Sequence, residues 1–482
     1  MNEKIGLNSL PQAKFHLGFI WSALAIAIFA GFTIGAHLAA VIGLDFPLGK
    51  GFYSFIQIHG HLQLVGWAGL FIIGISLHFI PRLAGIPLSH PEWLSRILWL
   101  ITAGLATRAV AHSHLPYVSS PAIFHAFSAV IALSGLSELA GIILYIVLLL
   151  TSIRAVRQSG KERPALQTVK PYFAMMQAGW LLYAILNAAL LIHMAAAGAV
   201  SVNQPWDDFA LNLFIGLVLL PVAFAFSVRM FPLYLRLPAP EWPVNKLGLI
   251  YLFCFALQTL PTLPPFLSMS PETAFFISAL GQCGKSMVIF LFVWKLDLLL
   301  RRREPWTVYR KFQPGPEREP TREGLPDYGE FGCFERLLYS AYLWLLFGAL
   351  LELLTGLATI FRWEMAVSTD AIRHSYLLGF ITLLILGMAP RMVPGFIQKK
   401  LASTKLVEAT FWLGNAAVIC RIVPLLLPEI ILEKVPVAVL FSQFAFALSG
   451  TFGLAAVSCL AVNLWRTATY NGTPDKANSA QK

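Results

Sequence analysis

Two histidines one residue apart open a long, apolar, glycine-punctuated segment, HGHLQLVGWAGLFIIGISLHFIPR, at residues 59–82. An imidazole placed in hydrocarbon must find a partner, because an unsatisfied polar ring costs free energy there. Residues i and i+2 of a regular helix point about 200° apart. His59 and His61 therefore cannot easily share one metal ion, and they suit two sites on opposite sides of the helix.

The histidines are unevenly distributed along the apolar segments. Of the eleven, most fall at one predicted depth, the outer half of the membrane: His37, His59, His61, His112, His114, His125, His193 and His374. Clustered imidazoles are what haem iron or copper requires. Because His374 is expected at the depth of His59 and His61, a bis-histidine haem between segments 53–80 and 370–392 is one hypothesis. Hydrogen bonds in helix packing are the alternative.

Two further features bear on metal and haem binding. Gly66 lies two turns below His59 and nearly on its face, so its missing side chain would let a flat macrocycle lie against the backbone. His112, His114 and His125 are close together in AHSHLPYVSSPAIFH and are the best outer candidates for copper. Solvated loop histidines are the alternative for these three.

The composition indicates a membrane protein. The chain has 482 residues, of which 57% are apolar and 12% charged, with a mean hydropathy of +0.70; soluble domains carry about 25% charged residues. The short, polar N-terminus and the long first apolar segment argue against a cleavable signal peptide. The five cysteines are scattered without CxxC or CxxCH, which disfavours a disulfide framework and a covalently attached c-type haem. Any haem is expected to be b-type, in one or two copies.

Twelve segments are long and apolar enough to cross a bilayer, which needs about 20 residues each. The sequence therefore predicts an all-α polytopic membrane protein with twelve transmembrane helices, numbered here as spans 1 to 12. The predicted spans are roughly 17–42, 53–80, 94–112, 127–152, 172–198, 207–232, 245–264, 273–300, 333–360, 370–392, 406–428 and 436–464.

Basic residues gather on one side of these spans. About 28 of the 35 Lys and Arg fall on the side that holds both termini, and the positive-inside rule makes that side cytoplasmic. We expect a multi-pass protein of the bacterial inner membrane. The net charge of +11 then reflects topology, including the runs at 301–303 and 399–400, and no nucleic-acid partner is expected.

An internal repeat relates spans 6 and 10. Residues 207–232 align with 369–394 at a constant offset of 162, and 59–82 shows the same pattern more loosely. The aligned pairs are Asp208 with Asp370, Asn212 with His374, and Arg229 with Arg391. The chain is predicted to be a single membrane domain, 1–482, of three four-helix pseudo-repeats at about 17–152, 172–300 and 333–464. Cytoplasmic loops are expected at 153–171 and 301–332.

Charged side chains within the spans suggest function, because intramembrane charge is costly. Arg421 is expected near the depth of the proposed haem and, like Arg373, could pair with a haem propionate. Glu138 and Glu352 could carry protons, or could pair with Lys285 or Arg421.

The stretch at 59–83 resembles the haem-ligating tenth span of cbb-type haem–copper oxidases. The shared elements are HxH (59–61), GWxG (66–69), Gly74 and PRL (81–83). Twelve spans in three four-helix units are also the architecture of that superfamily's catalytic subunit, subunit I. The resemblance implies that His59 is like the proximal ligand of a high-spin haem and His61 like a ligand of a low-spin haem.

The whole chain looks still more like the NnrS family of bacterial membrane proteins. The similar stretches are 59–89, VRMFPLYLR (228–236) and RHSYLLGFITLLILGMAPR (373–391). This resemblance implies haem and copper binding and tolerance of nitric oxide and nitrosative stress. The HAH of the family is HGH here, and its glycines before the middle arginine are replaced at 226–228.

A departure from the oxidases limits what chemistry is expected. Their copper ligands come from spans 6 and 7, but here span 6 has Asn212 and span 7 has no histidine. A standard oxygen-reducing haem–copper centre therefore cannot form at those positions. Since HxH is on span 2 instead of span 10, His374 is open to two roles, haem ligand or second-metal ligand.

Three functions remain open. The first is a haem protein that handles nitric oxide, with His59 at the iron that keeps an open position. The second is a terminal reductase of O₂ or NO, an oxidoreductase that needs a second metal and an electron donor. The third is a cofactor-free transporter, which leaves the histidine bias unexplained.

Overall fold

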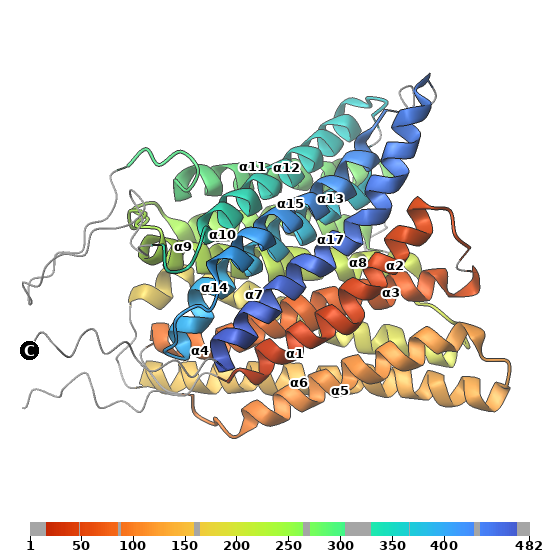
Figure 1. Ribbon diagram of the computed structural model, residues 1–482, viewed down its shortest axis with the longest axis horizontal. Coiled ribbons are helices and arrows are strands. Elements are labelled where there is room, and N and C mark those ends of the chain that lie inside the picture. The colour runs from red at the N-terminus through yellow and green to blue at the C-terminus, as the bar shows by residue number, and fades with distance from the viewer. Residues whose placement is uncertain are drawn as a thin grey trace, which may run out of the picture.

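The computed structural model describes residues 16–47, 49–84, 88–158, 164–263, 270–303, 329–365, 367–428 and 434–469. Throughout these ranges every regular element is a helix and no strand occurs. Figure 1 shows the helices packed side by side in one bundle. In these described ranges, eleven helices are long and apolar enough to span a bilayer. A further helix, α10 (Val244–Thr259), is apolar but shorter. The predicted all-α polytopic fold with twelve helices is confirmed.

Eight of the twelve spans are single α-helices. They are span 3, α5 (Trp93–His114); span 4, α6 (Pro121–Gln158); span 5, α7 (Pro164–Ala196); span 7, α10; span 8, α11 (Pro271–Leu296); span 9, α12 (Phe334–Phe361); span 11, α15 (Thr404–Leu426); and span 12, α17 (Pro436–Thr469).

The other four spans each hold a wider π-helical segment between two α-helices. They are span 1, α1 (Gly18–Ile26) and α2 (Phe32–Gly43) around Ala27–Gly31; span 2, α3 (Phe52–His61) and α4 (Leu70–Ala84) around Leu62–Gly69; span 6, α8 (Gln204–Leu213) and α9 (Leu220–Tyr234) around Phe214–Leu219; and span 10, α13 (Thr369–His374) and α14 (Leu383–Phe396) around Ser375–Thr382.

Spans 2, 6 and 10 form the centre of the bundle. In their most apolar windows 89%, 78% and 83% of the residues are buried, against 28–44% for the other eight long spans. A helix that is apolar on every face can be buried on every face, which explains why the outer helices surround these three. The central position agrees with the similarity that relates these spans in the sequence.

The π-helical segments also follow that similarity. At the offset of 162, Phe214 at the start of the span 6 segment aligns with Tyr376 near the start of the span 10 segment. π-Helical turns inside α-helices are frequent at functional sites. The structure thus places an irregular turn in each of the three central helices, and in span 2 it directly follows His61.

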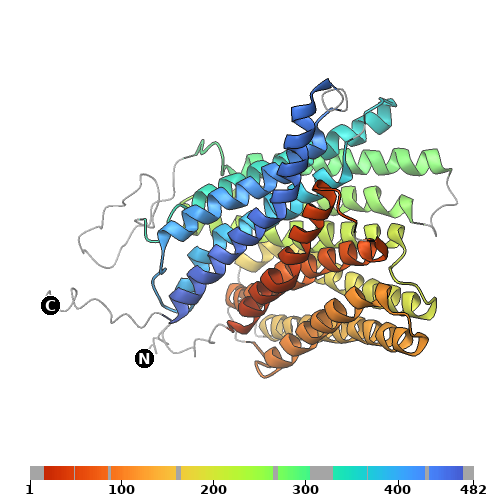
Figure 2. The same cartoon turned by 45° about the vertical axis from the view of Figure 1, so that its right-hand side comes forward.

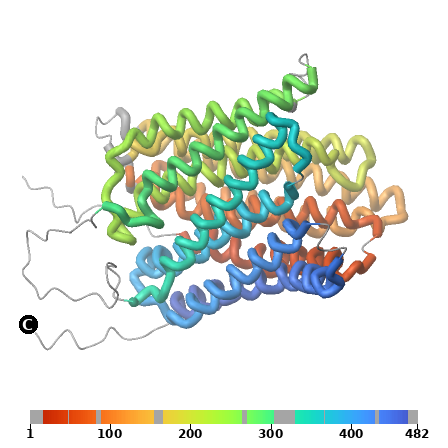
Figure 3. The backbone as a smooth tube through the Cα atoms, turned by 90° about the horizontal axis from the view of Figure 1, so that it is seen from above, coloured from red at the N-terminus to blue at the C-terminus, as the bar shows by residue number. Residues whose placement is uncertain are grey.

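The spans run lengthwise through the bundle, several of them tilted against their neighbours, with the connecting segments at the two ends of the bundle (Figure 3). Because the number of spans is even, α1 begins and α17 ends at the same end (Figure 2). The predicted loops at 153–171 and 301–332 lie partly outside the described residues, and so do both chain termini. The repeat boundaries and the cytoplasmic orientation stay predictions.

Candidate functional site

A cavity of about 750 Å³ lies between the central spans 2, 6 and 10 and the helices around them. It is lined by His59, His61 and His374, with Arg108, Arg373 and Arg421 among the other polar side chains. Most of the remaining lining is apolar, and residues 201–204, which lead into α8, line one end. Cofactor sites in proteins are typically mostly apolar cavities of about 300–1,000 Å³ with a few polar groups.

The His59 ring lines the cavity and contacts span 1. Its Nδ1 donates a hydrogen bond to the Gly31 carbonyl oxygen at 2.9 Å, at the end of the π-helical segment of span 1. The ring lies so close to Gly35 that a Cβ there would be 2.4 Å from the His59 Cε1. His374, Asp370 and Arg421 lie close enough to His59 to interact with it electrostatically and line the same cavity, so its side of the cavity is that of spans 10 and 11.

His374 is held in the same manner on span 10. Ser368 caps the N-terminus of α13, because its hydroxyl oxygen accepts a hydrogen bond from the Ala371 N–H. Within this helix Asp370 lies one turn before His374. The His374 Nδ1 lies 3.0 Å from the Asp370 carbonyl oxygen and 2.9 Å from its Oδ1. Arg421 of span 11 donates to the Asp370 Oδ2 at 2.8 Å. Asp370 therefore joins His374 to Arg421.

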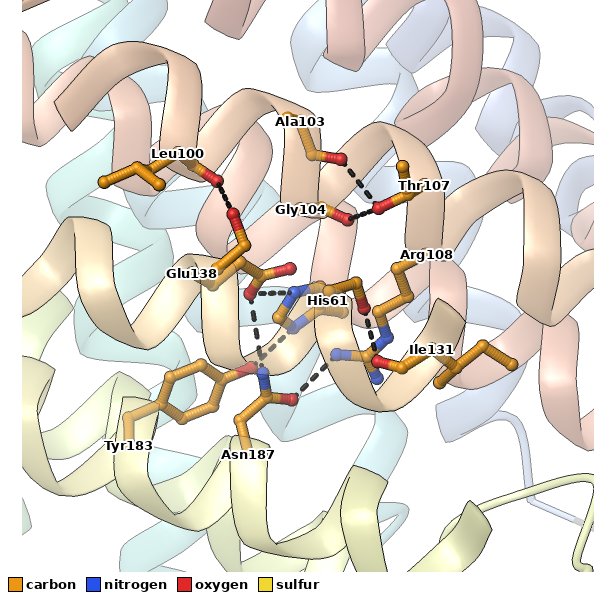
Figure 4. A network of polar contacts seen from close by, with 12 residues as sticks. His61, Leu100, Ala103, Gly104, Thr107, Arg108, Ile131, Glu138, Tyr183 and Asn187 are labelled. Atoms are coloured by element: carbon orange, nitrogen blue, oxygen red, sulfur yellow. Dashed lines mark hydrogen bonds and ion pairs between the residues drawn. The ribbon is translucent and has the colours of Figure 1, made fainter. Parts of the chain in front are cut away.

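His61 faces the other way, toward spans 4 and 5. Its Nε2 lies 2.8 Å from the Glu138 Oε2 and its Nδ1 lies 2.9 Å from the Tyr183 hydroxyl. Figure 4 shows these groups together with Asn187, which donates to Glu138 at 3.4 Å and accepts a 2.7 Å hydrogen bond from Arg108. Both nitrogens of His61 are thus engaged, and the structure brings His59, not His61, to the side of His374.

Gly66 does not take the position expected for it. A Cβ at Gly66 would lie 2.6 Å from the Ile26 side chain of span 1. The residue is absent from the cavity lining and serves the close packing of spans 1 and 2. The expectation that Gly66 forms a face for a macrocycle is wrong. Gly66 lies within the π-helical segment Leu62–Gly69, whose wider turns change its direction relative to His59.

The three proposed copper ligands do not converge. His112 is fully buried and its Nε2 donates to the Val200 carbonyl at 3.0 Å, whereas His114 is exposed and its Nδ1 binds the Val110 carbonyl. His125 lies exposed on α6. Among the described residues, no group of three or more His, Cys, Asp or Glu side chains is arranged to hold a metal ion. His112 and His114 are two residues apart and point to different sides of α5.

Two further ion pairs lie along the spans, one buried and one half-buried. Lys285 donates to the Glu352 Oε1 at 2.7 Å, and the Tyr376 hydroxyl donates to the Glu352 Oε2 at 2.7 Å. Arg373 contacts the Asp208 Oδ1 at 2.9 Å, so the aspartate that aligns with Asp370 in the repeat also meets an arginine. The buried Lys285–Glu352 pair thus keeps its two charges together inside the membrane, where an unpaired charge is costly.

Four residues of the site were not singled out from the sequence: Asp370 as the partner of His374, and Tyr183, Asn187 and Arg108 around His61. The contact between Asp370 and His374 could have been predicted from the sequence, because residues four apart meet on one face of a helix. The other three are on spans 3 and 5, more than 40 residues from His61, and nothing in their local sequence marks them.

No family model matches the chain, and no curated protein sequence matches it. Among solved structures, a chain of a haem–copper terminal oxidase dimer determined by cryo-electron microscopy superposes with a TM-score of 0.64. The superposition covers 95% of this chain and 84% of that chain at 11% sequence identity. The chain has a haem–copper oxidase fold.

This likeness establishes the architecture of a multi-pass membrane protein with a haem–copper-oxidase-like core. At such low identity the likeness carries no information on which ligands this chain binds. The haem–copper-oxidase-like part of the expected fold is confirmed, whereas the narrower resemblance to the NnrS family has no support from sequence matches.

Proposed function

We propose that this chain is a haem-binding membrane protein of the NnrS type and that His59 and His374 are its iron ligands. The observation that carries this proposal is the orientation of the two rings. Each Nδ1 donates to an oxygen, that of Gly31 or of Asp370, which leaves the lone pair on Nε2. Among the described residues neither Nε2 has a hydrogen-bond partner. Metal-ligating histidines are oriented by this kind of contact through the other ring nitrogen.

The rest of the cavity fits a porphyrin. Its volume of about 750 Å³ and largely apolar lining suit a flat macrocycle, and Phe32 and Phe446 are part of that lining. Arg373 and Arg421 line the same cavity, and each has a buried Nε without a partner in the described part of the chain. These guanidinium groups would hold the propionates. We assign the group as b-type haem, consistent with the absence of CxxCH.

Bound haem would supply an iron centre for nitric oxide, which would bind in place of one of the two imidazoles, since the two histidines would leave no open position. The protein's part is to hold the two imidazoles in one tautomer, to exclude water with an apolar wall, and to neutralise the propionates. We propose that the chain protects a bacterial cell against nitric oxide from the inner membrane, with both termini cytoplasmic. The proposal does not include copper, because His112, His114 and His125 do not converge.

Two other functions compete with this proposal. A terminal reductase of O₂ or NO would need an electron donor and a second metal, and spans 6 and 7 hold no histidine to bind that metal. A cofactor-free transporter would use the cavity for its substrate, but it would not require the two Nε2 atoms to be left free. Haem content separates the transporter from the others, and catalytic consumption of NO or O₂ separates the first two.

The test is the optical spectrum of the purified protein, oxidised, reduced and treated with NO, with haem quantified. We expect bis-histidine haem bands in the wild type and their loss in both His59→Ala and His374→Ala. His61→Gln is the matched control, because both nitrogens of His61 are engaged elsewhere, and it should retain haem. A folded protein without haem, or loss of haem in His61→Gln alone, would overturn the assignment.

A further inference from the structure

Arg108 is a buried cation whose charge has no partner in direct contact. It lies on span 3, is 3% exposed and lines the cavity on the side of His61. Among the described residues it forms one hydrogen bond, from a terminal nitrogen to the Asn187 Oδ1 at 2.7 Å. Within the described chain its Nε has no partner, although a guanidinium carries five N–H donors.

Other cationic side chains of the spans do have a carboxylate in direct contact. Lys285, Arg373 and Arg421 each meet a carboxylate oxygen within 3 Å. No ion pair to Arg108 exists among the described residues. A charge buried without a counter-charge costs several kcal/mol, so the fold is expected to keep this arginine for something that brings the negative charge.

Two carboxyl groups lie near Arg108, but among the described residues neither is in direct contact with it. Glu138 is hydrogen-bonded to His61 and to the amide of Asn187. Asp207, at the start of α8, interacts with Arg108 electrostatically but forms no ion pair with it. The guanidinium therefore lines the cavity without a further hydrogen bond to a described side chain beyond the one to Asn187.

We propose that Arg108 is the anchor of a second binding site in this cavity, which takes a small inorganic oxyanion such as nitrite or nitrate. A planar oxyanion can accept two parallel N–H bonds from a guanidinium, and the free Nε supplies one of the two donors. The site is independent of the proposed haem ligands, because Arg108 lies with His61 and Asn187 and not with His59 and His374.

Asp207 gives the proposal a distinctive consequence. Asp207 lines the same cavity as Arg108 and interacts with it electrostatically, so it competes with an anion there and its removal should tighten anion binding. A purely structural Arg108, kept only for its hydrogen bond to Asn187, would not produce this effect. Replacing Arg108 should have the opposite effect, because the charge-assisted hydrogen bonds to the anion are lost.

The experiment is a melting-temperature titration of the detergent-solubilised full chain with sodium nitrite, with sodium kept constant by gluconate. A ligand that binds only the folded state raises the midpoint with concentration, which gives a Kd. We expect saturable stabilisation of the wild type, weakening by about thirtyfold or more in Arg108→Gln, and tighter binding in Asp207→Asn.

His59→Ala separates this site from nitrite bound at haem iron, and it should retain nitrite stabilisation even if it loses haem. Stabilisation that vanishes in His59→Ala but persists in Arg108→Gln would place the anion on iron and overturn the proposal. An unchanged Kd in Arg108→Gln or in Asp207→Asn, or no saturable stabilisation of the wild type, would overturn it as well. Haem spectra of the same samples show separately whether the proposed function holds.

Discussion

Gly35 offers the sharpest test of how His59 is held. A methyl group at Gly35 would lie 2.4 Å from the His59 Cε1 and 2.9 Å from its Nδ1. Carbon atoms in ordinary contact are about 3.5–4.0 Å apart, so in Gly35→Ala the ring must move by about 1 Å. The hydrogen bond from Nδ1 to the Gly31 oxygen, 2.9 Å long, would then be stretched out of range.

The cost can be approximated from its two parts. Forcing an extra methyl group into a packed site costs about 1–3 kcal/mol, and the lost hydrogen bond adds about 0.5–1.5 kcal/mol. Both parts act on the ring that we assign as an iron ligand. Gly35→Ala should therefore melt at a lower temperature than the wild type and should purify with less haem, although every proposed ligand is still present.

Gly60→Ala is the matched control. This glycine lies between His59 and His61, and a Cβ there would meet nothing within 4 Å. Alanine is the better helix former by about 1 kcal/mol, so the variant should be as stable as the wild type or slightly more stable, which makes it the control for the added methyl group. The assay is haem per protein and melting temperature for all three proteins. A haem content and a melting temperature of Gly35→Ala equal to those of the wild type would refute the placement of His59 against span 1.

Two further predictions concern stability. In Lys285→Met the Glu352 carboxylate loses its 2.7 Å partner, which should cost about 3–5 kcal/mol; a melting temperature equal to the wild type's would show that the pair contributes nothing. Burial raises the pKa of the Asp297 carboxyl, but the N–H groups of Arg302 and Arg303 and the Arg302 guanidinium outweigh it, so the pKa is below its usual value. The stabilisation is then present above about pH 4 and lost as the pH falls through the lowered pKa, so melting curves of Asp297→Asn and wild type should converge in acid and differ at pH 7.

The sequence was a good guide to features set by local chemistry. Runs of apolar residues predicted the helices, because the membrane interior demands internally satisfied backbone. The i, i+2 spacing predicted that His59 and His61 face different neighbours, and they contact spans 1 and 4 respectively. The similarity of spans 2, 6 and 10 predicted their equivalence, and they are the three buried helices.

The sequence alone could not assign the two histidines to their partners. The rotation of span 2 about its axis is set by its contacts with span 1 at Gly31 and Gly35 and by the π-helical turn that follows His61. No local pattern encodes a rotation that depends on side chains from other helices. For the same reason, the expectation for Gly66 was wrong and the network of Arg108 around His61 was not foreseen.

The sequence by itself determined the number of helices and the directions in which neighbouring side chains of one helix point. Both depend on hydrophobicity and helical period, which are properties of consecutive residues. Only the tertiary structure decided that His59 and His374 share one side of the cavity while His61 is taken up by Glu138 and Tyr183. These contacts join residues 77 to 122 positions apart for His61. They form because packing fixes how each helix is turned, and packing is a property of the whole bundle.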